Sequence, residues 1–369
     1  MEAAALIDPG FWKQETPVLM GHEGHAPVGI PGLVYFRSSG STGEPKWIGL
    51  SREALLASAA AVNAHLQVDR DSCWVLALPL HHVGGFGVVA RVFQAGCRMA
   101  KFEDKWNAAA FAAWLEEIGG THLSLVPTQV HDLVAAGLRA PASLKAIVVG
   151  GGILGETTGR AARELGWPVL ASYGMTEAGS QIATQGLELL DRPYVTGPIG
   201  ILTNWEVNTD EDGRILLRGD ALFSGMLKSS EGEWKYEERS GEWFASSDLG
   251  KVENGQLQVL GRADTLVKIL GELVDPVAVE AELLALAGAA PGSAVVVAVA
   301  DPRAGNKLVL VHETVTPERP WAELLERYHA SRPGYRRIQS LIEVREIPKS
   351  PLGKPRRAEL SRFAAKRAI

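Results

Sequence analysis

Residues 36–47 read FRSSGSTGEPKW, a run of small and hydroxyl-bearing residues in front of one lysine. Glycine permits backbone conformations that other residues avoid, so the N–H groups of such a loop can converge on an anion. A helix that begins after the loop would add partial positive charge, and Lys46 would neutralise a phosphate. Pro45 and Trp47 exclude the GxxxxGK[ST] loop of P-loop nucleotide hydrolases. By composition alone a flexible surface loop is the simpler interpretation, so the rest of the chain has to decide.

The composition of the chain is that of an ordinary soluble globular protein. It has 369 residues, of which 46% are hydrophobic and 22% are charged, enough for about two domains. The net charge of -6 gives no reason to expect binding to nucleic acid or to an anionic membrane. Cys73 and Cys97 have no metal-ligand spacing and are interpreted as reduced packing residues.

The chain carries no recognisable signal for export or for a membrane. The start, MEAAALIDPGFWKQE, lacks the basic and apolar regions of a secretory signal. No stretch reaches the roughly 18 uninterrupted apolar residues of a membrane span. We therefore expect a cytoplasmic protein with small-molecule partners, no nucleic acid and no membrane span.

The pattern of the first 200 residues predicts an α/β domain with a doubly wound mixed sheet. Ser51 can cap a helix whose apolar side chains include Leu55 and Val62, and further helices are expected at 111–118 and 155–166. Short apolar runs typical of strands buried on both faces lie at 74–80, 122–127, 146–152 and 168–172.

The remainder of the sequence predicts a β-rich part and a small α+β domain. Residues 200–262 carry short alternating strands with turns at Asp212-Gly213 and Asn254-Gly255. Beyond Arg262 helix and strand patterns alternate. We predict a large domain at 1–262 and a small mobile domain at 263–369.

Five motifs, taken in order, resemble those of the adenylate-forming superfamily, which comprises acyl-CoA and aryl-CoA ligases, luciferases and the adenylation domains of nonribosomal peptide synthetases. FRSSGSTGEPK resembles the [YF]xSSGTTGxPK loop, LPLHHVGGFG (78–87) the LPLxHxxG segment and SYGMTE (172–177) the YGxTE motif. SDLGKVENGQLQVLGRADTLVKILGELVDP (247–276) resembles [ST]GDxG…GRxDxxIKxxGxxVxP, and PKSPLGKPRR (348–357) resembles PxxxxGKxxR. Each residue taken singly would be an ordinary surface group, so the interpretation depends on the five motifs together.

The resemblance implies a site for ATP and Mg²⁺. The residues that would cradle the β- and γ-phosphates are Ser38, Ser39, Gly40, Ser41, Thr42, Gly43 and Lys46. Thr176 would contact phosphate, and Glu177 would hold Mg²⁺, which prefers hard oxygen ligands. The residues that would surround adenine are Gly150, Gly151, Gly152, Tyr173 and Gly174. Asp248 and Arg262 would bind the ribose, and Lys354 would reach the α-phosphate during adenylation.

The same resemblance implies two half-reactions, the second with CoA as co-substrate. After the acyl-adenylate forms, rotation of the small domain would withdraw Lys354 and admit the thiol. Asp264 stands at the hinge position, and the segment from Lys268 to Gly271 would then approach the site.

The acid is indicated by two residues, His82 and Arg91. His82 would lie near the acyl pocket; with His81 it could suggest a metal, but adjacent residues of a strand point to opposite faces and no second ligand cluster is visible. HVGGFGVVARVFQAGCRM (82–99) resembles the o-succinylbenzoate-CoA ligases, and Arg91 interrupts its apolar helix. A second substrate carboxylate would explain a buried arginine. The alternative is an arginine whose charged end reaches the surface.

The sequence also departs from the family. Only about 35 residues precede the phosphate loop, where the family usually has a further subdomain, so we expect a shortened enzyme or a fragment whose exposed surface a partner or a homodimer covers. Ser247 and Ala278 replace residues that are common in the family. The alternatives to this ligase are another aryl- or acyl-CoA ligase, or a non-catalytic nucleotide or acyl-adenylate binding relative.

Overall fold

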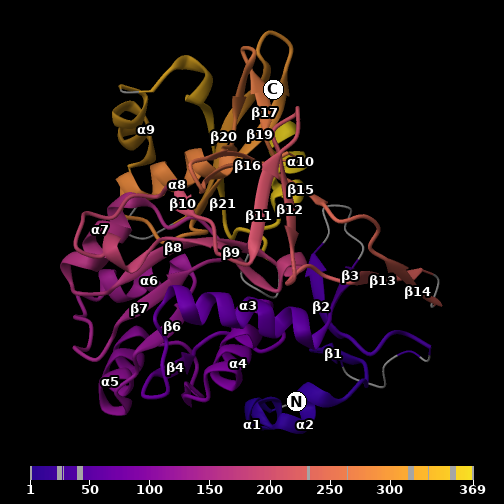
Figure 1. Ribbon diagram of the computed structural model, residues 1–369. Helices are drawn as coiled ribbons and strands as arrows, with labels where there is room; N and C mark the ends of the chain where they lie inside the picture. The colour runs from indigo at the N-terminus through magenta and orange to yellow at the C-terminus, as the bar shows by residue number, and fades with distance from the viewer. Residues whose placement is uncertain are drawn as a thin grey trace. The chain divides into compact units, whose positions relative to one another are not determined.

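The computed structural model describes residues 2–22, 27, 29–39, 45–230, 233–263, 265–314, 320–330, 332–349 and 355–367 (Figure 1). They form two compact units. The first comprises Met1–Leu154, Gly159–Ser246 and Gly250–Val259, and the second Gly155–Thr158, Ser247–Leu249 and Leu260–Ile369. Among the described residues, no helix combines the length and the apolar character that crossing a bilayer requires.

A six-stranded mixed sheet forms the centre of the first unit, in the order β5-β4-β6-β7-β8-β9. Its strands are β4 (Cys73–Leu76), β5 (Arg98–Lys101), β6 (His122–Leu125), β7 (Ala146–Val149), β8 (Val169–Met175) and β9 (Ser180–Thr184). All neighbours are parallel except β8 and β9. Every residue of β4, β6 and β7 is buried, as the continuous apolar runs predicted.

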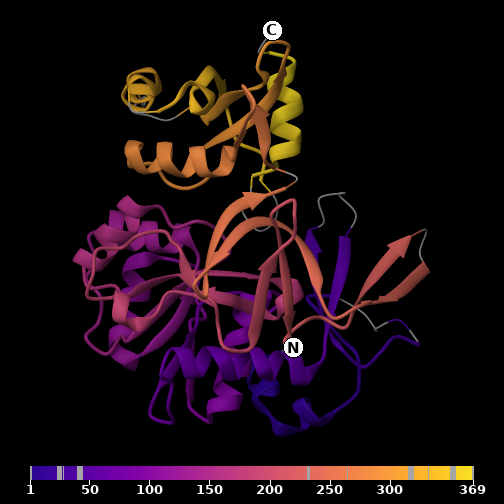
Figure 2. The ribbon, with the colours of Figure 1, turned by 45° about the horizontal axis from the view of Figure 1, so that its top comes forward.

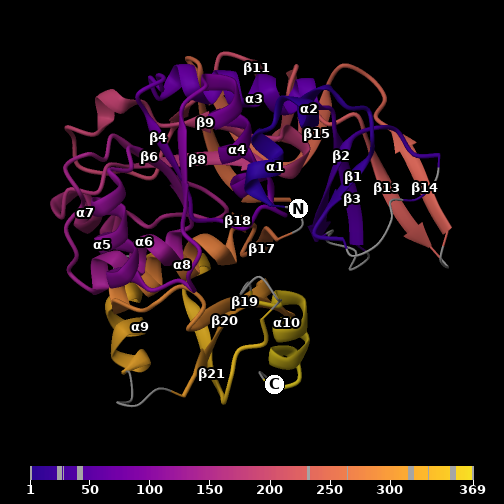
Figure 3. The same cartoon turned by 90° about the horizontal axis from the view of Figure 1, so that it is seen from below.

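Helices cover both faces of this sheet, so the prediction of a doubly wound α/β domain is confirmed. They are α3 (Arg52–His65), α4 (Val83–Ala95), α5 (Ala108–Ile118), α6 (Pro127–Ala135) and α7 (Glu156–Glu164). Side chains of α3 and α4 share one hydrophobic cluster with the sheet, and those of α5, α6 and α7 share another. Figure 3 shows the two groups on either side of β4 and β6. Ser51 caps α3 as predicted, because its hydroxyl accepts a hydrogen bond from the N–H of Ala54 at 3.0 Å.

A second sheet of the first unit joins segments that are far apart in the sequence. Its order is β1-β2-β3-β13-β14. The strands are β1 (Val18–Met20), β2 (Val34–Ser39), β3 (Pro45–Leu50), β13 (Gly225–Ser230) and β14 (Glu233–Glu238). The helix expected after the phosphate loop begins at Arg52, and a strand lies between the loop and this helix. Strand β3 follows the loop because it pairs with β2 on one side and with β13 on the other.

The N-terminal segment packs onto α4 through two short helices, α1 (Ala3–Ile7) and α2 (Pro9–Lys13). Phe11 and Trp12 are buried, and the Trp12 ring stacks on Phe93 with a centroid distance of 5.1 Å. The buried guanidinium of Arg52 donates hydrogen bonds to the carbonyl groups of Phe11, Thr16 and Gly32. The segment is thus part of the main core.

The β-rich part predicted at 200–262 is confirmed as a sheet in the order β10-β16-β15-β12-β11. Its strands are β10 (Ile199–Gly200), β11 (Trp205–Thr209), β12 (Arg214–Gly219), β15 (Phe244–Glu253) and β16 (Gln256–Arg262). Asn254 and Gly255 both have positive φ, which the tight turn between β15 and β16 requires.

The second unit is the small α+β arrangement that the sequence predicted. It contains β17 (Val267–Ile269), β18 (Glu272–Val274), α8 (Pro276–Ala287), β19 (Ala294–Asp301), β20 (Gly305–Glu313), α9 (Trp321–Ala330), β21 (Ile338–Val344) and α10 (Arg357–Ala365). Figure 2 shows α8 and α9 on one side of the sheet β19-β20-β21 and α10 on the other. Arg357 holds the buried carboxylate of Glu280 with two hydrogen bonds of 2.7 Å.

Candidate active site

The structure brings together Lys46 of the phosphate loop and Glu177 of the YGxTE-like motif. Lys46 lies near the start of β3, and Glu177 lies in the single turn η1 (Thr176–Ala178) between β8 and β9. The distance from Lys46 Nζ to Glu177 Oε1 is 3.4 Å, and the side chains are 32% and 14% exposed. Two opposite charges that are 131 residues apart therefore meet in a partly dry environment, where electrostatic interactions are strengthened.

The other predicted nucleotide residues of the first unit lie at the carboxyl ends of two neighbouring strands. Gly150, Gly151 and Gly152 directly follow β7, and Tyr173 and Gly174 lie in the last part of β8. Because β7 and β8 are parallel, these segments reach the same edge of the sheet. Open α/β sheets bind ligands at this edge.

Glycine is required at Gly174. A Cβ atom there would lie 1.8 Å from the carbonyl oxygen of Ser180. The backbones of β8 and β9 therefore approach each other closely on either side of η1, at the point where the register of the β8–β9 ladder shifts.

His82 lies at the N-terminal end of α4; the residue as a whole is partly exposed, but the Nε2 atom of its ring is buried. The expectation that His81 and His82 point to opposite faces of a strand was wrong, because β4 ends at Leu76 and both residues lie in the following turn. Their ring centroids are 4.3 Å apart. The part of the chain that the structure describes contains no cluster of three or more His, Cys, Asp or Glu side chains that could hold a metal ion.

Arg91 is buried in the core, with 1% of its surface exposed. The alternative of a charged end that reaches the surface is therefore wrong. Its Nη1 atom donates to Ser124 Oγ and its Nη2 atom to Ser180 Oγ, each at 3.1 Å, and the guanidinium lies 5.0 Å from the Trp74 ring centroid. Within the described residues, the Nε atom has no hydrogen-bond partner and no carboxylate forms an ion pair with the group. Burial lowers the pKa of Arg91 to about 9, so the group remains charged at neutral pH.

Sequence reasoning missed the residues that surround Arg91. Ser124 lies in β6 and Ser180 in β9, and no local pattern links either of them to α4. Ser180 has a φ of 148°, a conformation that is costly for a residue with a side chain and that is often retained at functional sites. The guanidinium packs closely against Gly87, since a Cβ atom at this position would lie only 3.2 Å from Arg91 Nη2.

Asp248 and Arg262, the predicted ribose-binding residues, belong to the second unit and lie next to each other. Arg262 Nε is 3.9 Å from Asp248 Oδ1, and its Nη2 atom donates to Ser247 Oγ at 3.1 Å. In the same unit Lys268 is exposed on β17, and Gly271 occupies the turn before β18 with a φ of +86°.

Several predicted residues lie outside the described part of the chain. These are Gly40, Ser41, Thr42, Gly43, Asp264 and Lys354, together with the side chain of Ser39. Ser38 is described and lies on β2 directly opposite Lys46.

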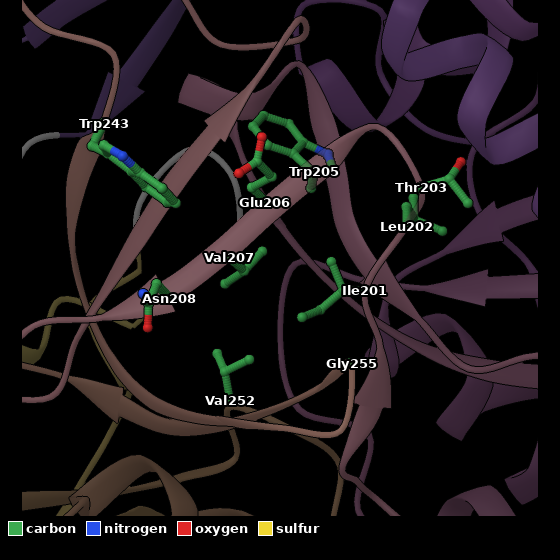
Figure 4. A pocket seen from close by; sticks show the side chains of 10 residues that line it. All are labelled: Ile201, Leu202, Thr203, Trp205, Glu206, Val207, Asn208, Trp243, Val252 and Gly255. Atoms are coloured by element: carbon green, nitrogen blue, oxygen red, sulfur yellow. The ribbon is translucent and has the colours of Figure 1, made fainter.

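A cavity of about 570 Å³ lies on the β-rich sheet (Figure 4). It is lined by Ile201, Leu202, Thr203, Trp205, Glu206, Val207, Asn208, Trp243, Val252 and Gly255. Among the described lining residues Glu206 alone is charged, and it already accepts a hydrogen bond from Arg218. None of the predicted site residues that the structure describes lines this cavity, so we do not take it as the candidate site.

Comparison with known proteins identifies a family and several relatives. The AMP-binding enzyme family matches residues 33–227. The 2-succinylbenzoate–CoA ligase of Escherichia coli is 33% identical over 279 residues, which are 75% of this chain and 57% of that protein. The enzyme of the same name from Enterococcus faecalis is 30% identical over 266 residues, 68% of this chain and 53% of that protein. The chain therefore spans about half the length of the curated relatives it matches.

The fold also has counterparts among solved structures. The o-succinylbenzoate CoA synthetase MenE from Bacillus subtilis, in complex with the acyl-adenylate intermediate OSB-AMP, superposes with a TM-score of 0.76 at 24% identity. The match covers 88% of this chain and 68% of that one. This likeness shows a shared fold.

Proposed function

The chain belongs to the AMP-binding enzyme family, and from this membership we propose that it activates a carboxylic acid with ATP and transfers the acyl group to CoA. The observation that carries the proposal is the meeting of Lys46 and Glu177 at the edge where the glycines after β7 and the end of β8 also lie. Such an arrangement can hold a triphosphate and its metal by position and charge, which is what this chemistry requires.

In the proposed first step, a carboxylate oxygen attacks the α-phosphate of ATP and inorganic pyrophosphate leaves. Lys46 and the backbone from Ser38 to Gly43 hold the outer phosphates, and Thr176 contacts phosphate. Glu177 fits Mg²⁺ because a single carboxylate together with substrate phosphates is a usual way to hold this ion. When bound, Mg²⁺ supplies neutralising charge to the triphosphate.

The remaining nucleotide contacts are part of the same proposal. Gly150, Gly151, Gly152, Tyr173 and Gly174 surround the adenine, and Asp248 with Arg262 binds the ribose hydroxyl groups. Lys354 reaches the α-phosphate, where negative charge increases during the attack.

The acid that fits the surroundings of Arg91 carries a second carboxylate, and we propose o-succinylbenzoate. A buried cation with no acidic partner among the described residues is costly, and a substrate carboxylate would compensate it. The two relatives named above are 2-succinylbenzoate–CoA ligases. On this basis the product enters menaquinone biosynthesis.

In the second step, the thiol of CoA attacks the acyl-adenylate and AMP leaves. We assign residues 1–262 to an ATP- and acid-binding domain and residues 263–369 to a small mobile domain that turns about Asp264. The turn brings the segment from Lys268 to Gly271 toward the acyl-adenylate. Because ATP and CoA are the co-substrates, we propose a cytoplasmic location for the protein. The homodimer remains a prediction.

The test is acid-dependent release of pyrophosphate from ATP. O-succinylbenzoate, benzoate, a medium-chain fatty acid and no acid are compared, each with and without CoA. We expect release only with o-succinylbenzoate, and a thioester only when CoA is present. Pyrophosphate release with another acid would refute o-succinylbenzoate as the substrate but leave the proposed reaction intact. No release with any acid would favour a non-catalytic binding relative.

A variant separates the two steps. Lys354→Ala is expected to lose acid-dependent pyrophosphate release but to keep the transfer from preformed acyl-adenylate to CoA. Normal pyrophosphate release by this variant would refute the role of Lys354.

A further inference from the structure

The sheet β1-β2-β3-β13-β14 places four polar residues in one row, and no motif includes the last two, Lys228 and Lys235. Ser38 lies opposite Lys46, Lys46 opposite Lys228, and Lys228 opposite Lys235. Directly opposite residues of antiparallel strands point to the same face, with Cβ atoms about 4.5–5.5 Å apart. Three lysines therefore lie side by side, beginning at the strand pair that flanks the phosphate loop.

The face that carries this row changes character along the strands. Two positions away from the row, Phe36, Ile48 and Met226 lie on the same face and pack in the main core, and the face becomes polar only at the row itself. The aromatic and aliphatic side chains of the alternate positions, among them Trp47, Leu227 and Tyr236, pack together on the other face. The side chain of Lys46 is 32% exposed and that of Lys228 is 51% exposed, and Lys235 is also exposed. A ligand from solvent can therefore reach all three ammonium groups.

The charges of the row are only partly balanced. Lys46 pairs with Glu177, and Lys228 Nζ donates to Glu237 Oε2 at 2.6 Å. The hydrogen bond from Lys228, and then the charges of Lys228 and Lys235, lower the pKa of the Glu237 carboxyl below its usual range despite some desolvation. Among the described side chains, two carboxylates form ion pairs with these three lysines, which leaves an excess of positive charge in this part of the row. Like charges directly opposite each other destabilise a sheet, and a bound polyanion would remove this repulsion.

We propose that Lys228 and Lys235 extend the phosphate site that begins at Ser38 and Lys46. The extended row binds the outer phosphates of ATP and the inorganic pyrophosphate that leaves. This inference rests on the proposed function for the identity of the anion. Ammonium groups suit it, because each is a compact charge that donates strong hydrogen bonds to phosphate oxygens.

Protection of a sheet edge explains only part of the row. Lysine on an edge strand hinders pairing with other chains, and β14 is the edge of this sheet. Lys228, however, lies on β13 between β3 and β14, where no edge needs protection. The pair with Glu237 accounts for the charge of Lys228 but not for its place opposite Lys46, and a polyphosphate ligand supplies a reason for that placement.

The experiment is calorimetric titration of the full chain with inorganic pyrophosphate and, separately, with AMP. Lys228→Gln and Lys235→Gln are compared with wild type and with Lys251→Gln, which removes an exposed strand lysine of the same unit outside the row. We expect Lys228→Gln to raise the Kd for pyrophosphate roughly tenfold and Lys235→Gln about threefold. The Kd for AMP should stay within about twofold in all variants, because AMP lacks the outer phosphates. Lys251→Gln should leave both constants unchanged.

Three results would overturn the inference. They are no measurable binding of pyrophosphate to the wild type, equal weakening of pyrophosphate and AMP, and an unchanged pyrophosphate Kd in both row variants. The titration contains no acid and no CoA, so it is independent of the ligase assay. Lys228-dependent pyrophosphate binding in a chain that activates no acid would refute the proposed function and keep the polyphosphate site.

Discussion

Replacement of Arg91 by methionine tests the acid site most directly, because it removes the charge and keeps a side chain of similar length. In the structure burial lowers the pKa of Arg91 from its ordinary value to about 9. At about 1.4 kcal/mol per pKa unit, holding this charge costs about 5 kcal/mol. Two hydrogen bonds from the charged group contribute about 1.5 kcal/mol each and the contact with Trp74 about 2 kcal/mol, which nearly offsets the cost.

The chain therefore gains almost no stability from this arginine. Arg91→Met should change the free energy of unfolding by less than about 2 kcal/mol, a small effect for a large buried side chain. Substrate binding should respond very differently. Removal of one partner of a buried charge pair costs about 2–5 kcal/mol. The KM of the variant for o-succinylbenzoate should therefore exceed the wild-type KM by a factor between about 30 and several thousand.

The assay measures pyrophosphate release while the acid and ATP are varied in turn, together with urea unfolding of both proteins. The KM for ATP should stay within about threefold of the wild-type value. Equal increases in the KM for the acid and for ATP would refute the carboxylate contact. A loss of about 5 kcal/mol in the free energy of unfolding would show that the hydrogen bonds and the Trp74 contact outweigh the cost of burying the charge. Arg91 would then have a structural role.

Two further predictions concern the core. Burial, offset in part by the hydrogen bond to the Leu66 carbonyl, lowers the pKa of His122 to about 4. The folded state thus binds this proton more weakly than the unfolded state, so the stability that neutral His122 provides is complete above about pH 6.5. About 3 kcal/mol should be lost as the pH falls from 6.5 to 4, and urea unfolding of His122→Asn should show a smaller slope over this range. Arg52→Ala should lower the free energy of unfolding by about 3 kcal/mol, because three backbone carbonyl groups lose their donor; Arg70→Ala, at an exposed position, is the matched control and should change it by less than about 0.5 kcal/mol.

Local patterns sufficed for much of the fold because most elements depend on near neighbours. The run AIVV (146–149) is apolar at every position and forms a strand buried on both faces. The turn at Asn254-Gly255 has a backbone preference that acts over two residues. In the second unit, helix α8 begins at Pro276, as expected for proline in the first turn.

The sequence could not predict the pairing of β3 with β13. Residues 45–50 and 225–230 form neighbouring strands although about 180 positions of the chain separate them. Neither stretch contains a local pattern that predicts pairing with the other. The lysine row across this sheet could not be predicted from the sequence either, because it depends on the same strand pairing. The surroundings of Arg91 were equally hidden, because Ser124 and Ser180 come from two other strands.

The N-terminal segment has a direct consequence for the proposed acid site. Helix α4 carries His82 at its start and Arg91 further along, so displacement of this helix would displace both residues. Phe11 and Trp12 pack against Phe86 of α4 at centroid distances of 6.1 and 6.0 Å. Arg52 holds the same segment through the carbonyl of Phe11. Residues that resemble no family motif therefore fix the helix on which acid recognition is proposed to depend, and Arg52→Ala should raise the KM for the acid as well as lower stability.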